Sequence, residues 1–210
     1  MLIEEYSDTF ELLVVEVQIM NREIRMITGY GPQETWAEEE RLPFFQALEQ
    51  EIIKAELQGK SIYIEMDSNS KLGSEMIPND PHNQSPNGKV LAGIINRHGL
   101  IVGNGVGRKC EGLITRKRET VNSVEESVID HVVFSEDLEN DLESIKIDEE
   151  RNHVLTKLVK TKKGTKKTLS DHNPIISKFN IKWNRKLKNR RIEMYNLKNK
   201  NGQAQFKDLT

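Results

Sequence analysis

The chain contains a single cysteine, Cys110, among its 210 residues. One cysteine excludes an intrachain disulfide framework and any zinc site built from several cysteines, and it fits a reducing compartment. No stretch approaches the roughly 18 consecutive apolar residues of a membrane span, and the acidic N-terminal segment is unlike a secretory signal. We therefore expect no membrane association and an intracellular location, nuclear or cytoplasmic.

The sequence also lacks a glycine loop of the kind that cradles phosphate groups. Gly103–Gly107 is rich in glycine, but the lysine and the helix that follow such a loop are missing, which predicts an ordinary turn. Hydrophobic residues make up 36% of the chain, aromatic residues 6%, and the mean hydropathy is −0.63. These values are typical of a soluble protein with a modest core, and 210 residues suffice for one sizeable α/β domain.

The net charge of −2 conceals a strong asymmetry along the chain. Residues 1–60 hold 13 acidic and 5 basic residues, whereas residues 151–210 hold 3 acidic and 17 basic residues. This density of positive charge favours a polyanionic partner, because neutralising phosphates releases counterions. We predict that the partner is a nucleic acid; the alternative is a solvated basic tail without a specific partner. The predicted contacts are Lys162, Lys163, Lys166, Lys167, Arg185, Lys186, Lys188, Arg190 and Arg191.

The first half of the chain predicts strands alternating with helices. Extended runs are expected at residues 9–19, 24–30, 61–65 and 100–102. A helix is expected to begin near Arg41, with Pro43 in its first turn, and to stop at Gly59. A second helix is expected after Asn87-Gly88 and before Gly99.

The second half of the chain predicts mainly strands. They are expected at residues 112–116, 128–134, 143–147, 154–160 and 174–181. Gly164 is expected to turn a hairpin that leads to Ser170. The whole pattern predicts an α/β sandwich, with one domain at residues 1–182 and a basic linker or tail at residues 183–210.

Polar residues follow several of the apolar runs. Asp67 and Asn69 come just after the run at residues 61–65, and their spacing of two places both side chains on one side of an extended backbone. The carboxylate could orient a water molecule or accept its proton, and the amide could donate to a phosphate oxygen. The alternative is an ordinary turn, because Asp-Ser-Asn is typical turn composition.

Asp130, Asp171 and His172 form a second polar group. Adjacent side chains on an extended chain point in opposite directions, so Asp171 is a poor partner for His172. A carboxylate on the apolar strand at Asp130 needs a cationic or hydrogen-bonding partner. We therefore predict an Asp130–His172 pair, which would favour the imidazolium and fix one tautomer. The alternatives are a salt bridge from Asp130 to a lysine and an ordinary loop histidine.

Tyr30, at the end of the second predicted strand, could place its hydroxyl on a phosphate oxygen; the alternative is an amphipathic residue at a strand end. Carboxylates, an amide and a histidine together are what metal-assisted hydrolysis of a phosphate ester needs. A hard cation takes oxygen ligands, and a histidine can transfer a proton near neutral pH.

Four short segments occur in a specific order: Gly29-Tyr30-Gly31-Pro32, Met66-Asp67-Ser68-Asn69-Ser70-Lys71-Leu72-Gly73, Ser127-Val128-Ile129-Asp130-His131-Val132 and Ser170-Asp171-His172-Asn173-Pro174. This order resembles the endonuclease/exonuclease/phosphatase superfamily, and within it the apurinic-type endonuclease domain of non-LTR retrotransposons. The stretch from Arg191 to Lys198 resembles the linker between such a domain and a reverse transcriptase.

The resemblance implies a four-layer α/β sandwich and cleavage of DNA phosphodiesters that depends on Mg²⁺ or Mn²⁺. It implies catalytic roles for His172, Asp130, Asp67, Asn69 and Tyr30, and metal-binding roles for Asp171, Asp67 and Asn69. Asp67 would orient the nucleophilic water, Asn69 would bind phosphate or metal, and Tyr30 would contact the phosphate. His172, held by Asp130, would stabilise or protonate the pentavalent phosphate.

The chain also departs from the family pattern. The family opens with a strand bearing an asparagine and a strand ending in a metal-binding glutamate, and the first thirty residues leave no room for both. We therefore expect an N-terminally truncated domain that lacks those strands, with weaker Mg²⁺ binding and exposed sheet edges that favour a homo-oligomer or a partner. Met66 and Ser68 replace a glycine and a large apolar residue, which predicts a crowded or loosened turn around Asp67.

Three functions are compatible with these observations. The leading prediction is an enzyme, a metal-dependent DNA endonuclease domain of a retrotransposon-type protein with reduced activity. The second is a non-catalytic chain that binds nucleic acid through its basic C-terminal part. The third is a phosphatase that acts on a lipid or small phosphoester, because one fold can host several chemistries.

Overall fold

A computed structural model describes residues 11–19, 21–153, 156–161 and 164–181, without the side chains of residues 11, 157–161 and 165–168. Its α-helices and strands are β1 (Glu11–Ile19), β2 (Arg22–Tyr30), α1 (Glu38–Leu57), β3 (Ser61–Asp67), α2 (Pro86–Arg97), β4 (Leu100–Val102), β5 (Cys110–Glu111), β6 (Arg116–Glu119), β7 (Val124–Ser127), β8 (Asp130–Ser135), β9 (Leu142–Ile147), β10 (Thr156–Thr161), β11 (Gly164–Leu169) and β12 (Ile175–Phe179). Short 3₁₀ turns lie at Gly103–Gly105, Gly107–Lys109 and Glu136–Leu138.

The centre of the fold is a sheet with the strand order β1-β2-β3-β8-β4. β1 and β2 form an antiparallel hairpin, β2 runs parallel to β3, and β8 lies antiparallel between β3 and β4. A parallel pair needs a crossover connection, and α1 lies on this connection. β3 is mostly buried and reads as a nearly continuous apolar run, as expected for a strand covered on both faces. The four strands predicted in the first half are therefore confirmed.

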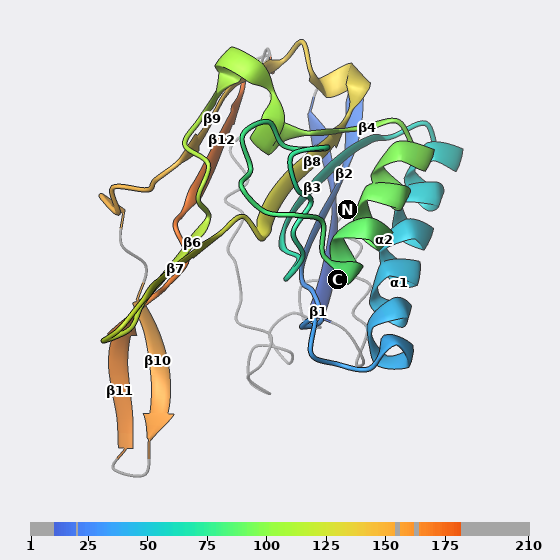
Figure 1. Ribbon diagram of the computed structural model, residues 1–210. Coiled ribbons are helices and arrows are strands. Elements are labelled where there is room, and N and C mark those ends of the chain that lie inside the picture. The colour runs from blue at the N-terminus through green and yellow to red at the C-terminus, as the bar shows by residue number, and fades with distance from the viewer. Residues whose placement is uncertain (1–10, 20, 154–155, 162–163, 182–210) are drawn as a thin grey trace.

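Two layers cover the two faces of the central sheet. Helices α1 and α2 lie on one face, and a second sheet with the order β12-β9-β5 lies on the other (Figure 1). A first apolar core, with Leu48 and Ile64 among its members, lies between the helices and the central sheet. A second core, with Phe134 and Ile145 among its members, lies between the two sheets. The described residues thus form a helical layer and two packed sheets of the predicted α/β sandwich.

Two antiparallel hairpins, β6–β7 and β10–β11, lie on the side of the molecule away from α1 and α2 (Figure 1). Gly164 pairs with Thr161 at the tip of β10–β11, as predicted for a hairpin turn. β8, β9, β10 and β12 confirm the strands predicted at residues 128–134, 143–147, 154–160 and 174–181, with bounds shifted by one or two residues.

Helix α1 begins earlier than predicted. A start near Arg41 would place Pro43 in the first turn, but the helix begins at Glu38 and Pro43 lies inside it. The first turn is acidic, which is favourable at the positive end of a helix dipole. The Ala37 N–H donates to Glu40 Oε2 at 3.1 Å. These interactions at the N-terminus help to offset the helical hydrogen bond that Pro43 removes.

Helix α2 also begins earlier than predicted, because Asn87 and Gly88 lie inside it. Pro86 occupies its first position, where an N–H would have no helical partner in any case. Ser85 is the N-cap residue, and its Oγ accepts a hydrogen bond from the Gly88 N–H at 3.1 Å. The capping serine therefore determines this helix start.

The prediction of a strand at residues 112–116 is wrong. The chain forms β5 before this segment and β6 from Arg116 onward. Gly112 lies between them with a φ of 85°, in the left-handed region, which interrupts an extended strand. Arg116 consequently begins a separate hairpin strand instead of ending a longer one.

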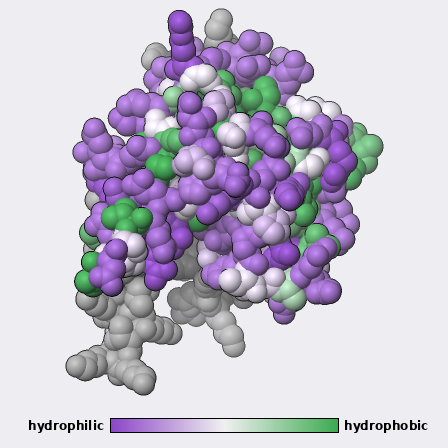
Figure 2. All heavy atoms as spheres, in the orientation of Figure 1, coloured by the Kyte–Doolittle hydropathy of each residue, from purple (hydrophilic) through white to green (hydrophobic). Residues whose placement is uncertain are grey.

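Residue 182, the predicted end of the domain, and the predicted linker at residues 183–210 lie outside the described residues, so this division of the chain stays a prediction. Within the described residues, no helix is long and apolar enough to cross a membrane. The face of the molecule in Figure 2 is mainly hydrophilic, with small scattered hydrophobic areas.

Candidate active site

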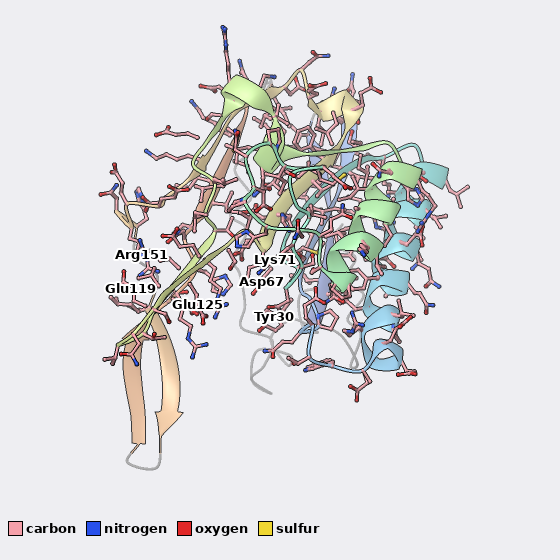
Figure 3. The ribbon with its side chains drawn as sticks, in the orientation of Figure 1. Tyr30, Asp67, Lys71, Glu119, Glu125 and Arg151 are labelled. Carbon is pink, nitrogen blue, oxygen red and sulfur yellow. The ribbon has the colours of Figure 1, made fainter. Side chains whose placement is uncertain are left out.

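Three neighbouring strands of the central sheet bring polar side chains to one place. Tyr30 ends β2, Asp67 ends β3 and Asp130 begins β8. The strand register pairs Tyr30 with Asp67 and Asp67 with Asp130. Residues that face each other across neighbouring strands project to the same face of a sheet, so these three side chains form a row. Figure 3 shows Tyr30 and Asp67 close together at this end of the sheet.

His172 joins this row from the segment between β11 and β12. Its Nδ1 lies 3.0 Å from both carboxylate oxygens of Asp130, so the predicted contact between Asp130 and His172 is present. Its Nε2 lies 3.7 Å from Asp67 Oδ2, which is too far for a hydrogen bond. One ligand atom each from Asp67, Asp130 and His172 lie within 4.8 Å of one another. We call these three residues the acidic triad.

The turn after β3 fixes the Asp67 carboxylate. Asn69 has a φ of 47°, and its backbone N–H donates to Asp67 Oδ1 at 3.0 Å. Its side-chain Nδ2 donates to the Gly31 carbonyl at 2.7 Å, which joins this turn to the end of β2. Asn69 thus buttresses Asp67, and its role in binding phosphate or metal stays a prediction.

Met66 and Ser68 fit this turn well. Met66 is buried in the core between the sheet and the helices. Ser68 is fully buried, and its Oγ donates to the Ile129 carbonyl at 2.9 Å and lies 2.6 Å from Ser70 Oγ. The prediction of a crowded or loosened turn is therefore wrong, because the small hydroxyl finds hydrogen-bond partners where a large apolar side chain would not.

The surroundings of the acidic triad favour the neutral form of Asp67 and the charged form of His172. Burial raises the pKa of Asp67 to about 6, and the negative charge of Asp130 acts in the same direction. The hydrogen bond to Asp130 raises the pKa of His172 above its usual value, and burial opposes this shift. Near neutral pH the site therefore favours an imidazolium beside carboxylates, one of which is poised to accept a proton.

The donor set of the acidic triad fits a hard divalent cation. Carboxylate oxygens are the ligands that Mg²⁺ and Mn²⁺ prefer. The mutual repulsion of the Asp67 and Asp130 charges would be offset by a cation between them. Asp67 and Asp130 are thus the residues of this site that would hold the metal.

Asp171 has a different environment from the one predicted for a metal ligand. Its Oδ2 accepts a hydrogen bond from Arg116 Nε at 3.0 Å. Asp171 is not part of the acidic triad, and its role as a metal ligand stays a prediction. No local sequence pattern signals this pairing, because it depends on β6 lying beside the segment that carries His172.

Glu65 is a further carboxylate near the site that sequence reasoning missed. It lies two residues before Asp67 on β3, so both project to the same face. The Tyr63 hydroxyl donates to Glu65 Oε2 at 2.6 Å. Burial raises the pKa of Glu65, and the Asp130 charge adds to this effect. The alternation along the strand is the sequence signal that could have identified it.

None of the nine basic residues predicted to contact DNA has a described side chain. Lys166 and Lys167 belong to β11, of which only the backbone is described at these positions. The others, Lys162, Lys163, Arg185, Lys186, Lys188, Arg190 and Arg191, lie outside the described residues. Their contacts with DNA stay predictions.

The fold of this chain is similar to the folds of several solved structures. No protein-family model matches the chain, and no curated protein matches it. The endonuclease domain of TRAS1, a telomere-specific non-LTR retrotransposon, matches 85% of this chain with a TM-score of 0.52 and 16% identity. The 3′-5′ exonuclease NExo from Neisseria meningitidis matches 80% with a TM-score of 0.59 and 14% identity. A second NExo structure, described as a 3′ phosphatase bound to a product DNA hairpin, matches 80% with a TM-score of 0.55 and 16% identity.

An endonuclease/exonuclease/phosphatase family protein from Bacteroides thetaiotaomicron matches 78% of the chain with a TM-score of 0.50 and 13% identity. This chain covers 65% of the TRAS1 domain, 64% of NExo and 52% of the Bacteroides protein. At these identities the likeness concerns the fold. The chain has the α/β fold of the endonuclease/exonuclease/phosphatase proteins.

Proposed function

We propose that this chain carries the active site of a DNA endonuclease that hydrolyses phosphodiesters with the help of Mg²⁺, or of Mn²⁺ in its place. The observation that carries this proposal is the acidic triad, in which the ligand atoms of Asp67, Asp130 and His172 lie within 4.8 Å of one another. A general acid, a carboxylate that can accept a proton and oxygen ligands for a cation are thereby combined at the end of a rigid sheet.

His172 is the residue that meets the negative charge of the phosphate. Asp130 accepts a hydrogen bond from the Nδ1 N–H at 3.0 Å, which fixes the ring and favours the imidazolium. The Nε2 N–H is then directed away from Asp130 and can donate to a phosphate oxygen. An imidazolium at this position stabilises the charge that develops on the pentavalent phosphate and can return a proton to the leaving oxygen.

Asp67 is the residue that handles the attacking water. Its carboxylate is held by the Asn69 N–H at 3.0 Å and is ionised near neutral pH. It can accept the proton of a water molecule while the water oxygen bonds to phosphorus and the bond from phosphorus to the leaving oxygen breaks. The divalent cation, when bound by Asp67 and Asp130, supplies Lewis-acid polarisation of the phosphate.

Tyr30 and Asn69 would complete the contacts to the phosphate. Tyr30 pairs with Asp67 in the strand register, and its side chain is exposed at the same end of the sheet. DNA as the substrate is supported by the basic character of residues 151–210 and by the fold shared with nucleases. A retrotransposon-type context is supported by the likeness to the TRAS1 endonuclease domain.

The test is nicking of supercoiled plasmid DNA by the purified chain, with Mg²⁺, Mn²⁺ or EDTA. We expect nicking that needs the divalent cation and falls at least about 100-fold in His172→Gln and in Asp67→Ala. His98→Gln is the matched control. His98 caps the C-terminal end of α2 and contacts Glu49 and Glu56, so its substitution should leave the nicking rate unchanged. Circular dichroism checks that each variant is folded.

Two results would contradict the proposal. A folded chain that retards DNA but does not nick it with either cation would favour the non-catalytic binding protein. Release of phosphate from 3′-phosphorylated DNA ends or small phosphoesters, without nicking, would favour a phosphatase at the same site.

A further inference from the structure

Arg116 lies beside the acidic triad on a strand that the sequence did not connect with it. Arg116 forms an isolated antiparallel bridge with His172, and the next residue, Lys117, donates its N–H to the Asp171 carbonyl at 2.8 Å. Residues opposite each other in an antiparallel pair project to the same face. The side chains of Arg116 and His172 therefore project on the same side, toward the place where Asp130 holds the imidazole.

The guanidinium of Arg116 is anchored at one end and has donors left at the other. Its Nε donates to Asp171 Oδ2 at 3.0 Å, and the side chain is 27% exposed. Among the described residues, Arg116 Nε is the guanidinium atom that makes a hydrogen bond, and Nη1 and Nη2 make none. Two nitrogens with parallel N–H groups match two oxygens of a phosphate, and an anchored guanidinium loses little freedom when it binds.

The charge of Arg116 reaches the reacting groups. Arg116 is paired with His172 in an isolated antiparallel bridge, and His172 Nε2 lies 3.7 Å from Asp67 Oδ2. The guanidinium therefore lies on the side of the site where a phosphate shared by Asp67 and His172 would bind. A pentavalent phosphate carries more negative charge on its outer oxygens than the starting phosphodiester, so a second cation beside His172 would favour the transition state.

The backbone around Arg116 is fixed by a second arginine. Arg151 donates from Nη2 to the Lys117 carbonyl at 2.7 Å and to the Asp171 carbonyl at 3.3 Å, and from Nε to Asn173 Oδ1 at 3.1 Å. Figure 3 shows Arg151 on the side of the molecule that carries β6 and β7. Arg151 therefore clamps β6 to the segment that carries His172, and the position of Arg116 relative to the site is held by hydrogen bonds on both sides.

We propose that Arg116 binds the scissile phosphate through Nη1 and Nη2, and that Asp171 is a positioning residue that holds the guanidinium. This inference rests on the proposed phosphodiesterase function. It gives Asp171 a role through Arg116 in place of a direct role as a metal ligand.

The test compares Arg116→Gln, Arg116→Lys and Arg116→Ala with the control Lys117→Gln. Lys117 is next to Arg116, contacts Glu126 at 3.0 Å and points to the other face of the strand. We expect the nicking kcat/KM to fall about 100-fold in Arg116→Gln and to remain unchanged in Lys117→Gln. Arg116→Lys should recover only part of the loss, because a lysine keeps the charge without the two-pronged geometry. Added guanidinium, but not ammonium, should partly restore Arg116→Ala.

The role of Asp171 is tested by Asp171→Asn and the double variant Arg116→Gln/Asp171→Asn. A positioning residue predicts that the double variant is no slower than Arg116→Gln alone, and that the Mg²⁺ concentration for half-maximal rate is unchanged in Asp171→Asn. Multiplying effects together with a raised Mg²⁺ requirement would overturn the positioning role and favour a metal ligand.

A binding measurement separates this inference from the proposed function. The anisotropy of a labelled DNA duplex in EDTA is followed against salt for the full chain and for Arg116→Gln. We expect weaker binding and a log–log salt slope reduced by about one in Arg116→Gln. If the wild-type chain does not nick DNA but this difference is seen, the proposed function fails and the phosphate contact of Arg116 stands. If wild type nicks DNA and Arg116→Gln matches it in rate and binding, the inference is overturned and the function stands.

Discussion

The Asp67 carboxylate is partly buried and lies beside the carboxylate of Asp130. Both features make its ionised form, which the proposed reaction needs, unfavourable in the folded chain. Its pKa of about 6 lies well above the ordinary value of 3.8 for this group. The folded chain therefore holds the ionised carboxylate at a cost in stability, which a bound cation would remove. His172 shows the opposite behaviour, because the hydrogen bond to Asp130 stabilises its charged form.

Asp67→Asn should stabilise the chain in the absence of divalent cations. Between pH 3.8 and about 6 the unfolded chain ionises Asp67 while the folded chain keeps it protonated. Wild-type stability therefore falls as the pH rises through this window, by roughly 1–3 kcal/mol, and the penalty is constant above it. We expect the thermal stabilisation by Asp67→Asn to be larger at pH 8 than at pH 4.5, as measured by scanning calorimetry in EDTA.

Mg²⁺ provides the second half of this measurement. It should raise the melting temperature of the wild-type chain but not that of Asp67→Asn, because binding to the folded state alone stabilises it. Equal effects of the substitution at both pH values would contradict the buried-charge description of Asp67.

At the scale of elements, the site depends on how closely the ends of β2 and β3 approach each other. The Gly31 N–H donates to the Asp67 carbonyl at 2.6 Å, which extends the parallel pairing by one hydrogen bond. A Cβ at Gly31 would lie 2.4 Å from the Ser68 carbonyl oxygen. Only glycine therefore allows the turn that presents Asp67 to pack against the end of β2.

Gly31→Ala should displace this turn and reduce both stability and activity. We expect a loss of about 1–3 kcal/mol in the free energy of unfolding, as for overpacked sites, together with a strong loss of nicking. Urea unfolding and the plasmid assay measure the two effects.

Gly93→Ala in α2 is the matched control for this substitution. Its added Cβ would meet only the flexible end of Arg97 at 3.3 Å, and alanine is the better helix former by about 0.5–1 kcal/mol. Gly93→Ala should therefore leave activity intact and stability unchanged or higher. If Gly31→Ala behaved like Gly93→Ala, the close approach of β2 and β3 would not matter for the site.

At the scale of the whole molecule, the distribution of charge separates an acidic N-terminal part from a basic C-terminal part. Within residues 1–60 the described elements are β1 and β2 of the central sheet and the whole of α1, which covers the face of the sheet away from the β6–β7 and β10–β11 hairpins. The β6–β7 and β10–β11 hairpins lie on the other side (Figure 1), and the lysines of β11 are in the second of them. A polyanion such as DNA would therefore be attracted to the side of the molecule that carries these hairpins.

Removal of residues 183–210 tests how much of the predicted DNA affinity comes from the basic tail. This segment contains 8 basic and 2 acidic residues. We expect the chain ending at residue 182 to bind DNA more weakly and with a shallower log–log salt slope, because fewer counterions are released. Anisotropy titrations at several salt concentrations give both values. An unchanged slope would show that the tail does not contact DNA and would leave the hairpins as the binding surface.

Local sequence patterns determined the elements and the types of chemistry. Most strands were predicted from apolar runs and from the alternation of apolar and polar residues, because the burial of a strand depends on its own side chains. The errors arose where other contacts decided the outcome. Helix α1 starts earlier than predicted, with glutamates in its first turn, and α2 starts earlier because Ser85 caps it. The left-handed conformation of Gly112 interrupts the strand predicted at residues 112–116.

The pairing of Asp130 with His172 was predicted because a carboxylate on an apolar strand needs a partner, but the sequence left a lysine open as the alternative, and the structure decided for His172. The sequence by itself predicted an α/β sandwich with most of its strands and both helices, the carboxylates near strand ends and the basic C-terminal part. Only the tertiary structure decided that Asp67 and Asp130 face each other, that Asp171 contacts Arg116, and that Arg116 lies beside His172. These contacts depend on strand register and on the packing of β6 against the His172 segment, and residues far apart in sequence carry no local signal of such pairings.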